Sequence, residues 1–344
     1  AYRVMAGVIF KQKGVAMVCS NGTNAATPKG RPRAILRQLR GIQAIFLVAA
    51  AVLVFTNASA ADLALPPVNL GETSFQDGIA FPGWLVEETF VYYDANSFTD
   101  SKGKDIPGSN RLTAMSAVTH VAWISSFRVL GGFYGAEVLL PLADLDFDTD
   151  FGPNGRERGM GDLIVGPLFI QWSDSKLFGM PYFHRFNLDF VLPTGEYRQN
   201  SPVNVGSNIY TFNPYYAFTL IPTERLEVSA RWHYLWCSEN SDPFVGLGAD
   251  NTQPGQAFHA NFAASYEMLK GLRLGLNGYY LQQLTDDQID GDDQAASKER
   301  VLGIGPGLKY TYERLSLYLN TYYETAAENR PEGLRGILRL SMVF

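Results

Sequence analysis

The chain has 344 residues, with 28 basic and 34 acidic side chains. The first sixty residues hold eight of the basic side chains and no Asp or Glu, so the remainder carries 20 basic against 34 acidic ones. This acidic remainder argues against a nucleic-acid partner, which would need a basic surface. Apolar residues make up 46% of the chain and aromatic residues 13%, which argues against a disordered polymer.

Residues 1–60 have the pattern of a secretory signal region. The basic stretch 31–40 precedes a 14-residue apolar run at 42–55, and Ala58-Ser59-Ala60 supplies the small residues of a cleavage site. A membrane anchor is the alternative, but this run is shorter than the roughly 20 residues that span a bilayer as a helix. We expect export and cleavage near Ala60. Residues 1–30 then belong to an over-extended start or to a longer signal region.

Residues 61–83 precede the first predicted strand and are too apolar for a free periplasmic tail. We expect them to fold into the lumen of a barrel as a plug or constriction. The side chains that would contact the inner wall include Leu63, Leu65, Phe75 and Phe81. A flexible lead-in is the alternative, since chain ends are often disordered unless they are tied down.

Residues 84–344 divide into segments of about ten residues separated by turn residues, the pattern of a transmembrane β-barrel. Long and short connections alternate throughout, as periplasmic turns and external loops do in outer-membrane barrels. An even strand number places both ends of the barrel in the periplasm. After residue 60 no 18-residue apolar run occurs, and Cys237 is the only cysteine, so neither a membrane helix nor a disulfide is expected. The predicted strands number about twelve: 84–95, 111–124, 128–142, 160–173, 181–193, 208–221, 225–238, 256–269, 271–284, 299–312, 314–325 and 334–344.

The alternation within the strands separates two faces. Between 226 and 236 apolar residues occupy every second position, and the intervening positions include Glu227, Arg231 and His233. A soluble β-sandwich would alternate in the same way. The export signal and the aromatic residues near strand ends favour a membrane barrel instead. The fold class is therefore all-β, an antiparallel up-and-down transmembrane barrel with an N-terminal signal peptide.

The last strand ends in Phe344, with apolar residues at every second position before it. This ending resembles the C-terminal signature of bacterial outer-membrane proteins. The resemblance implies location in the outer membrane of a Gram-negative bacterium, among membrane lipid and lipopolysaccharide. It also implies recognition by the outer-membrane assembly machinery through Phe344.

Several short motifs occur in order along the predicted barrel. They are Gly159-Met160-Gly161-Asp162, Leu192-Pro193-Thr194-Gly195-Glu196-Tyr197, Asn213-Pro214-Tyr215-Tyr216-Ala217-Phe218 and Gln282-Gln283-Leu284-Thr285-Asp286-Asp287. With these motifs the chain resembles a family of outer-membrane channels named for the meta-pathway of phenol degradation. The resemblance covers about 84–344 and implies diffusion-driven uptake of small hydrophobic or aromatic compounds, without enzyme activity. From the residues alone, the Gly and Pro positions of these motifs are adequately explained as turn and strand-end residues.

Function in a barrel would depend on the residues that face inward. Alternation predicts a mixed set of charged lumen-lining side chains, which can brace the wall through charge-assisted hydrogen bonds or line an aqueous path. Both interpretations stay open for each residue. The set is Glu137, Arg185, Asp189, Glu227, Arg231, His233, Glu267, Arg273, Lys309, Glu324, Arg335 and Arg339.

Other classes of function have weaker support. Acidic runs at 144–150 and 286–293 could bind calcium, but the second has Ser297 where a bidentate Glu is required, so solvated external loops and no metal are expected. No cofactor is expected. A barrel lipase would need a nucleophile and a base within hydrogen-bond reach. The sequence around the four histidines indicates no such pair. A general small-solute porin and a structural or adhesive barrel remain alternatives.

Overall fold

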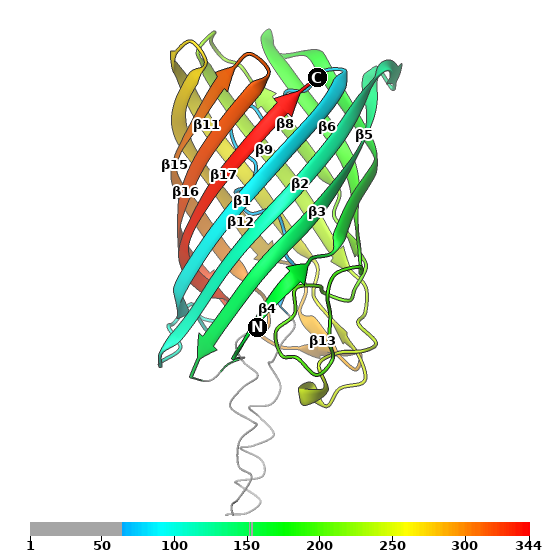
Figure 1. The fold of residues 1–344 in the computed structure, drawn as a ribbon, viewed down its shortest axis with the longest axis vertical. Helices are drawn as coiled ribbons and strands as arrows, with labels where there is room; N and C mark the ends of the chain where they lie inside the picture. The colour runs from blue at the N-terminus through cyan, green and yellow to red at the C-terminus, as the bar shows by residue number, and fades with distance from the viewer. Residues whose placement is uncertain (1–63, 151, 153) are drawn as a thin grey trace, which may run out of the picture.

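The computed structural model describes residues 64–150, 152 and 154–344. The expected signal region, its cleavage site and Leu63 lie outside the described residues. Within them, the chain folds as a closed barrel of antiparallel strands (Figure 1). The prediction of a twelve-stranded up-and-down barrel is confirmed. No helix in the described part is long and apolar enough to cross a membrane.

Twelve strands form the wall in the described part of the chain. Two short strands, β4 (Gly155–Met160) and β7 (Thr211–Phe212), extend the wall at one end by pairing with β3 and with β6 and β9. The same end carries a small separate sheet of β10 (Thr252–Gln253), β13 (Asp287–Ile289) and β14 (Asp292–Gln294), and the chain also has a 3₁₀ helix, η1 (Val245–Leu247). The wall strands are β1 (Gly83–Phe98), β2 (Asn110–Val129), β3 (Gly132–Thr149), β5 (Leu163–Leu177), β6 (Met180–Leu192), β8 (Tyr215–Leu220), β9 (Leu226–Cys237), β11 (Ala257–Leu269), β12 (Leu272–Gln283), β15 (Arg300–Tyr312), β16 (Leu315–Glu328) and β17 (Pro331–Val343).

The barrel closes where the first strand meets the last. β1 pairs with β17 from Leu85↔Val343 to Phe98↔Pro331. At the end of this seam Trp84 and Phe344 exchange backbone hydrogen bonds of 3.4 and 2.9 Å. Closure leaves no unpaired strand edge, which is the condition for a sheet to cross a bilayer.

One end of the barrel has short turns, and we call it the short-turn rim. Two of its hairpins turn on Leu130-Gly131 and Phe178-Gly179, and all four residues have positive φ between 50° and 82°. Such pairs match the twist of two-residue hairpins. The sequence predicts the first of these turns at 125–128. This prediction is wrong, because β2 continues to Val129 and the chain turns at Leu130-Gly131. Its tip, Leu130, is apolar and 82% exposed, so composition does not mark it as a turn.

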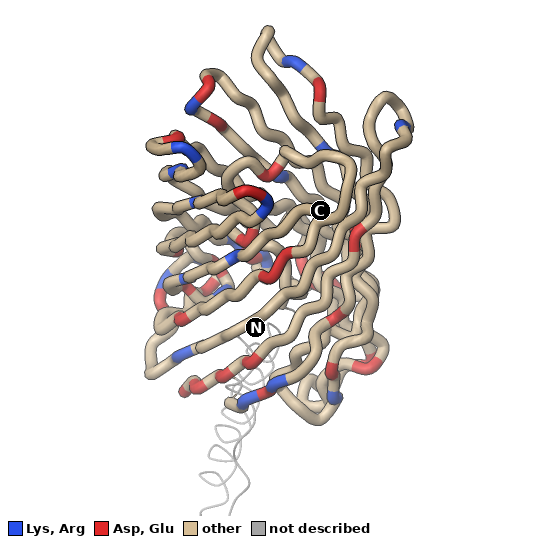
Figure 2. The backbone as a smooth tube through the Cα atoms, turned by 45° about the horizontal axis from the view of Figure 1, so that its top comes forward, with Lys and Arg blue, Asp and Glu red and all other residues tan. Residues whose placement is uncertain are grey.

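The opposite end carries the long connections and is the long-loop rim. In Figure 1 β4 and β13 lie at this rim and the C-terminus at the other. Since short turns face the periplasm in outer-membrane barrels, the long-loop rim is the external one. Charged residues of both signs are interspersed along the backbone (Figure 2).

The strand β9 shows how the two faces are divided. Its polar residues are inside, with Glu227 at 0% and His233 at 3% exposure. Its apolar residues are outside, with Trp232 47% and Tyr234 39% exposed. A soluble protein would reverse this arrangement, whereas a lipid-facing wall requires it. The outer face of the barrel therefore meets the hydrocarbon of the outer membrane.

The acidic run near 144–150 is not a loop. The sequence predicts a connection at 143–159, whereas β3 continues to Thr149 and pairs with β4 through Phe147↔Gly155. The hairpin extends beyond the lipid-facing band, so its outward positions are hydrated and carry charges. Asp144, for example, pairs with Arg156 at 2.7 Å. Strand alternation persists, but the polar residues have moved to the outside.

Residues 64–82 run through the interior of the barrel. At the long-loop rim the backbone N–H of Leu65 donates to the Glu299 carboxylate at 3.0 Å. Toward the short-turn rim the N–H of Gly78 donates to the Thr219 hydroxyl at 2.9 Å. The segment thus spans most of the barrel's length before β1 begins.

Candidate functional site

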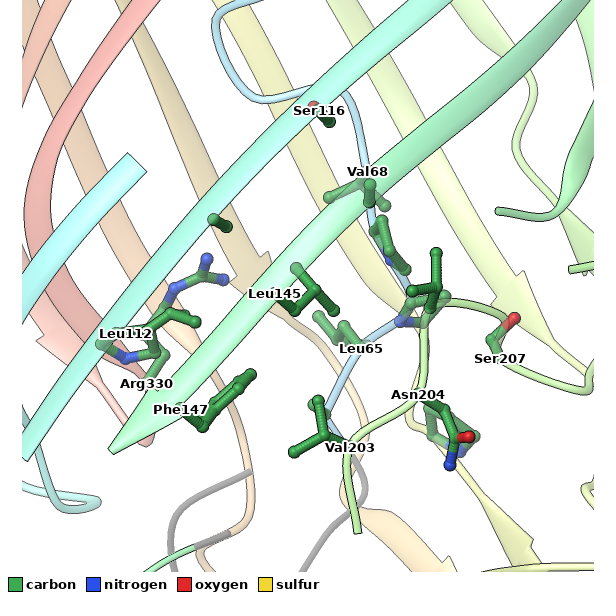
Figure 3. Close-up of a pocket in the computed structure, with 18 of the residues that line it drawn as sticks. Leu65, Val68, Leu112, Ser116, Leu145, Phe147, Val203, Asn204, Ser207 and Arg330 are labelled. Atoms are coloured by element: carbon green, nitrogen blue, oxygen red, sulfur yellow. The ribbon is translucent and has the colours of Figure 1, made fainter. Parts of the chain in front are cut away.

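An apolar cavity of about 450 Å³ lies in the external half of the barrel, and we call it the vestibule. Figure 3 shows Leu65 and Val68 of the interior segment facing side chains of β2 and β3 across it. Its apolar lining includes Leu112, Leu145, Phe147, Val203, Val205, Pro243, Phe244 and Leu247. Ligand sites in proteins are typically apolar hollows with a few polar groups that fix orientation. The vestibule fits that description.

The inner faces of β2 and β3 supply one side of the vestibule. Leu112 and Ala114 point inward from β2, and Ala143, Leu145 and Phe147 do so from β3. Sequence analysis misses Ala143, Leu145 and Phe147, because it predicts a loop at 143–159. The signal was present, since Ala143, Leu145 and Phe147 occupy alternate positions between aspartates.

A folded loop supplies the other side. Asp162, which is buried, accepts hydrogen bonds from the backbone N–H groups of Gly195 and Ser207, both at 2.8 Å. Gly195 and Gly206 pack backbone against backbone, where a Cβ would come within 2.8 Å of the opposite Cα. This clamp brings Val203 into the vestibule at 4% exposure. The Gly and Asp positions of the family motifs therefore shape the cavity.

A second, mid-barrel cavity of about 180 Å³ adjoins the vestibule. Both are lined by Val68, Glu72, Ser116 and Val205. The walls of the mid-barrel cavity are charged. Its charged or titratable lining residues are Glu72, Glu87, His120, Glu137, Asp162, Asp189, Arg231, His233 and Arg339.

A hydrogen-bond network holds the mid-barrel carboxylates. The imidazole of His120 lies between two of them, 3.0 Å from Glu87 and 3.1 Å from Glu137. Glu137 also accepts hydrogen bonds from Asn187 at 2.5 Å and from the Tyr215 hydroxyl at 3.2 Å. Buried charges persist only when they are paired in this way.

The structure buries ten of the twelve sequence-predicted lumen residues, and leaves Glu267 and Arg335 half-buried. Five of the twelve line the mid-barrel cavity. Arg185 donates a 3.1 Å hydrogen bond to the Tyr215 hydroxyl, which in turn donates to Glu137 of that cavity. The ten buried residues are Glu137, Arg185, Asp189, Glu227, Arg231, His233, Arg273, Lys309, Glu324 and Arg339.

Other members of the set lie apart from that cavity. Near the short-turn rim Arg273 pairs with Glu267 at 3.2 Å and reaches Glu227 through the Ser265 hydroxyl. Lys309 donates to the Gln76 side chain of the interior segment at 2.7 Å. These residues line neither cavity, and their contacts brace the wall.

The interior segment is fixed to the wall along its length. Asp77 receives two 2.7 Å hydrogen bonds from the guanidinium of Arg231. Gly71, at φ +82°, donates to Asn261 at 2.8 Å and accepts from the Tyr322 hydroxyl at 2.7 Å. A Cβ there would lie 2.7 Å from the Tyr322 ring, so only glycine fits.

The apolar side chains of the segment differ in their surroundings. Phe75 is fully buried, and Leu65 is half-buried against Leu235 and Cys237. Phe81 is 58% exposed and meets the edge of Phe183 at 6.1 Å between ring centroids. The middle of the segment is therefore tightly packed, whereas its end at the short-turn rim is exposed to solvent.

One serine and one histidine come within hydrogen-bond distance on the outer face. Ser175 Oγ lies 3.1 Å from His184 Nε2, a pair that sequence analysis did not identify. The ring is stacked on Trp172 at 4.7 Å, and its Nδ1 has no hydrogen-bond partner among the described residues. A catalytic histidine needs a group that orients it, so this pair is incomplete. Nor do the described residues contain a group of three or more His, Cys, Asp or Glu that could hold a metal.

The described geometry defines a class of protein: a twelve-stranded outer-membrane β-barrel. The family model described as "Putative MetA-pathway of phenol degradation" matches residues 95–340, and the chain belongs to this family. No curated protein is significantly similar in sequence.

Solved structures support the fold. An outer membrane channel from Pseudomonas putida F1 is similar with a TM-score of 0.70 and 19% identity, over 78% of this chain and 98% of that one. A deletion mutant of TodX, a monoaromatic hydrocarbon channel, is similar with a TM-score of 0.41 and 7% identity, over 78% of this chain and 92% of that one. The first likeness establishes the shared barrel fold.

Proposed function

We propose that this protein is an outer-membrane channel through which small hydrophobic or aromatic compounds enter by diffusion. The observation that carries the proposal is the apolar vestibule at the external end of an otherwise polar lumen. A general porin keeps a wide aqueous path, and apolar walls there would serve no hydrated solute. Leu145 and Phe147, by contrast, offer an apolar surface to an aromatic solute, whose transfer out of water is favourable.

Three alternative functions have weaker support. A general small-solute porin conflicts with the packing of residues 64–82 inside the barrel. A structural or adhesive barrel gives no reason for an apolar cavity of about 450 Å³. A lipase-type enzyme would require an oriented base, which the Ser175–His184 pair does not have.

We further infer that residues 61–83 act as a plug, after removal of a signal peptide near Ala60. The buried ion pair between Asp77 and Arg231 and the close fit of Gly71 support this role. Membrane lipid contacts the outer face, and we propose lipopolysaccharide as its external neighbour. We also propose that the assembly machinery recognises Phe344, which pairs with Trp84 in the closed barrel.

The test is uptake by the refolded chain 61–344 in liposomes. Leu145→Asn replaces an apolar vestibule side chain with a polar one of similar size, and should lower toluene uptake without lowering arabinose leakage. Leu142→Ala is the matched control, because Leu142 is 52% exposed on the outer face of the same strand. Equal toluene uptake by all three proteins would contradict the proposal.

A further inference from the structure

Most charges around the two cavities are paired with one another. At the external end Arg330 lies 3.0 Å from Glu299. In the mid-barrel Arg231 holds Asp77 with two hydrogen bonds of 2.7 Å. Such pairs offset the cost of removing each charge from water. Arg335 of β17, Glu72 of the interior segment and Asp189 of β6 have no ion pair among the described residues.

Arg335 lines the vestibule but has no carboxylate within 4.0 Å among the described residues. Its guanidinium lies over the rings of Tyr93 at 4.9 Å and Tyr279 at 5.6 Å. The hydroxyls of those tyrosines donate to Glu324, at 2.6 and 2.8 Å. Arg335 is therefore held by these rings and by a 3.5 Å hydrogen bond from its Nη1 to the Leu70 carbonyl, while its Nε has no hydrogen-bond partner in the described part of the chain.

Arg339 lines the mid-barrel cavity four residues further along β17. Its guanidinium lies 3.9 Å from the centroid of the Tyr318 ring. It also forms an ion pair with Glu87 at 3.8 Å, a distance too long for a hydrogen bond. The Nε of Arg339 also lacks a partner among residues 64–344 as described.

Glu72 of the interior segment lines both cavities, at the boundary between them. Its carboxylate makes no hydrogen bond or ion pair among the interactions of the described residues. The positive charges that act on it are Arg335, Arg339 and Arg231. Since Arg231 is bound to Asp77 and Arg339 is paired with Glu87, Arg335 is the cation near Glu72 that has no carboxylate partner among the described residues.

We propose that Arg335 and Arg339 form a carboxylate-binding site, and that the channel admits aromatic acids whose ring occupies the vestibule. Arg335 has no carboxylate partner among the described residues and Arg339 has only the 3.8 Å contact with Glu87, so a monocarboxylate would add a negative charge where Arg335 lacks one. Arginine presents a rigid fork of donors that binds carboxylates in a bidentate manner. The tyrosine rings fix the guanidinium groups of Arg335 and Arg339 whether or not a ligand is bound.

In this proposal Glu72 occupies the position that the carboxylate of a ligand would take. Its carboxylate stands in the field of the same arginines that a ligand would use, but no hydrogen bond fixes it. An incoming aromatic carboxylate competes with Glu72 for Arg335 and loosens the interior segment at that point. This inference rests on the proposed channel function and adds aromatic carboxylates to the neutral aromatic compounds that the channel admits.

The experiment compares benzoate with benzyl alcohol, a neutral molecule of similar shape, in liposomes that contain the refolded chain 61–344. Arg335→Met keeps much of the side-chain length but removes the charge, and should lower benzoate uptake on the order of tenfold with little change for benzyl alcohol. Arg335→Lys should restore part of the benzoate uptake. Glu72→Gln should raise benzoate uptake.

Arg273→Met is the matched control, because Arg273 is a buried lumen cation that lines neither cavity and whose hydrogen bonds go to residues outside the interior segment. Heat-dependent mobility on gels would confirm that each variant has folded. A parallel fall for benzoate and benzyl alcohol in Arg335→Met, or no fall for either, would overturn the carboxylate site. Failure of the wild-type protein to pass either compound would instead contradict the proposed channel function itself.

Discussion

The external and internal halves of the lumen are built from different chemistry. The external half encloses the vestibule, where Leu145 and Phe147 face Leu65 and Val68 across open space. The internal half is filled by hydrogen-bonded polar groups, such as Asn320 with Ser74 at 3.0 Å and Lys309 with Gln76 at 2.7 Å. The contrast shows that the same strands can enclose an open apolar cavity at one end of the lumen and a filled, hydrogen-bonded region at the other.

The interior segment takes part in both halves. Its external part contributes apolar side chains to the vestibule, and its internal part contributes Ser74, Gln76 and Asp77 to the polar packing. If this division is correct, removing the segment should open the internal half and weaken the external site. The predictions below follow from that division.

Deletion of residues 62–80 should give the largest effect. It empties the internal half, so single-channel conductance should rise several-fold over that of the intact chain 61–344. Planar bilayer recordings at matched salt would measure it. Unchanged conductance would show that the segment does not limit the path.

Breaking the Asp77–Arg231 ion pair should give the second-largest effect. Asp77→Asn leaves a buried guanidinium without its carboxylate, which costs about 3–5 kcal/mol in comparable cases. The docked state of the segment should be weakened by that amount, and brief openings should become more frequent in recordings. Asp94→Asn is the control, since the Asp94–Arg111 pair is exposed to solvent and contributes little to stability. Equal opening frequencies in the two variants would mean that the buried pair does not hold the segment.

The start of the segment gives a third prediction. Because Leu65 contacts Glu299 at the external rim, Ala64→Cys should react with a membrane-impermeant thiol reagent added to intact cells. Cys237, which is 1% exposed, serves as the internal control for unreactive thiol. Labelling only after the outer membrane has been disrupted would contradict the described path of residues 64–82.

The smallest expected effect concerns the external sheet of β10, β13 and β14. Burial raises the pKa of Asp287 to about 7, with a further contribution from the charge of Glu299. The folded state therefore binds the proton more tightly than the unfolded chain, and the sheet should lose stability as pH rises from about 4 to about 7. Protease cleavage between 285 and 298 should be faster at pH 8 than at pH 5.

Asp287→Asn should remove most of that pH dependence, because the amide does not ionise. Asp292→Asn, at an exposed position of the same hairpin, should keep it. A pH dependence that persists in Asp287→Asn would assign the effect to another group.

The barrel itself could be predicted from sequence. Strands such as 226–236 alternate clearly, and the predicted inward residues Glu227, Arg231 and His233 are buried. The extension of β3 could not be recognised, because outside the lipid-facing band hydrated aspartates replace apolar residues on the outer face. Composition then suggests a loop where a strand continues.

The vestibule was harder to predict, for a different reason. Its loop side depends on Asp162 accepting hydrogen bonds from Gly195 and Ser207, which are 33 and 45 residues away in sequence. Nothing in the local pattern indicates that the loop folds inward. Likewise, the pairing of Asp77 with Arg231 joins positions 154 residues apart.

The most direct test of the account is to record conductance and solute uptake for the refolded chain 61–344 in the same lipid. The account predicts low conductance together with clear uptake of small aromatic compounds, because the internal half is filled and the external half binds apolar rings. Large, steady conductance with uptake of sugars would contradict it and define a general porin. Passage of no solute at all would contradict it equally, and would favour a structural barrel.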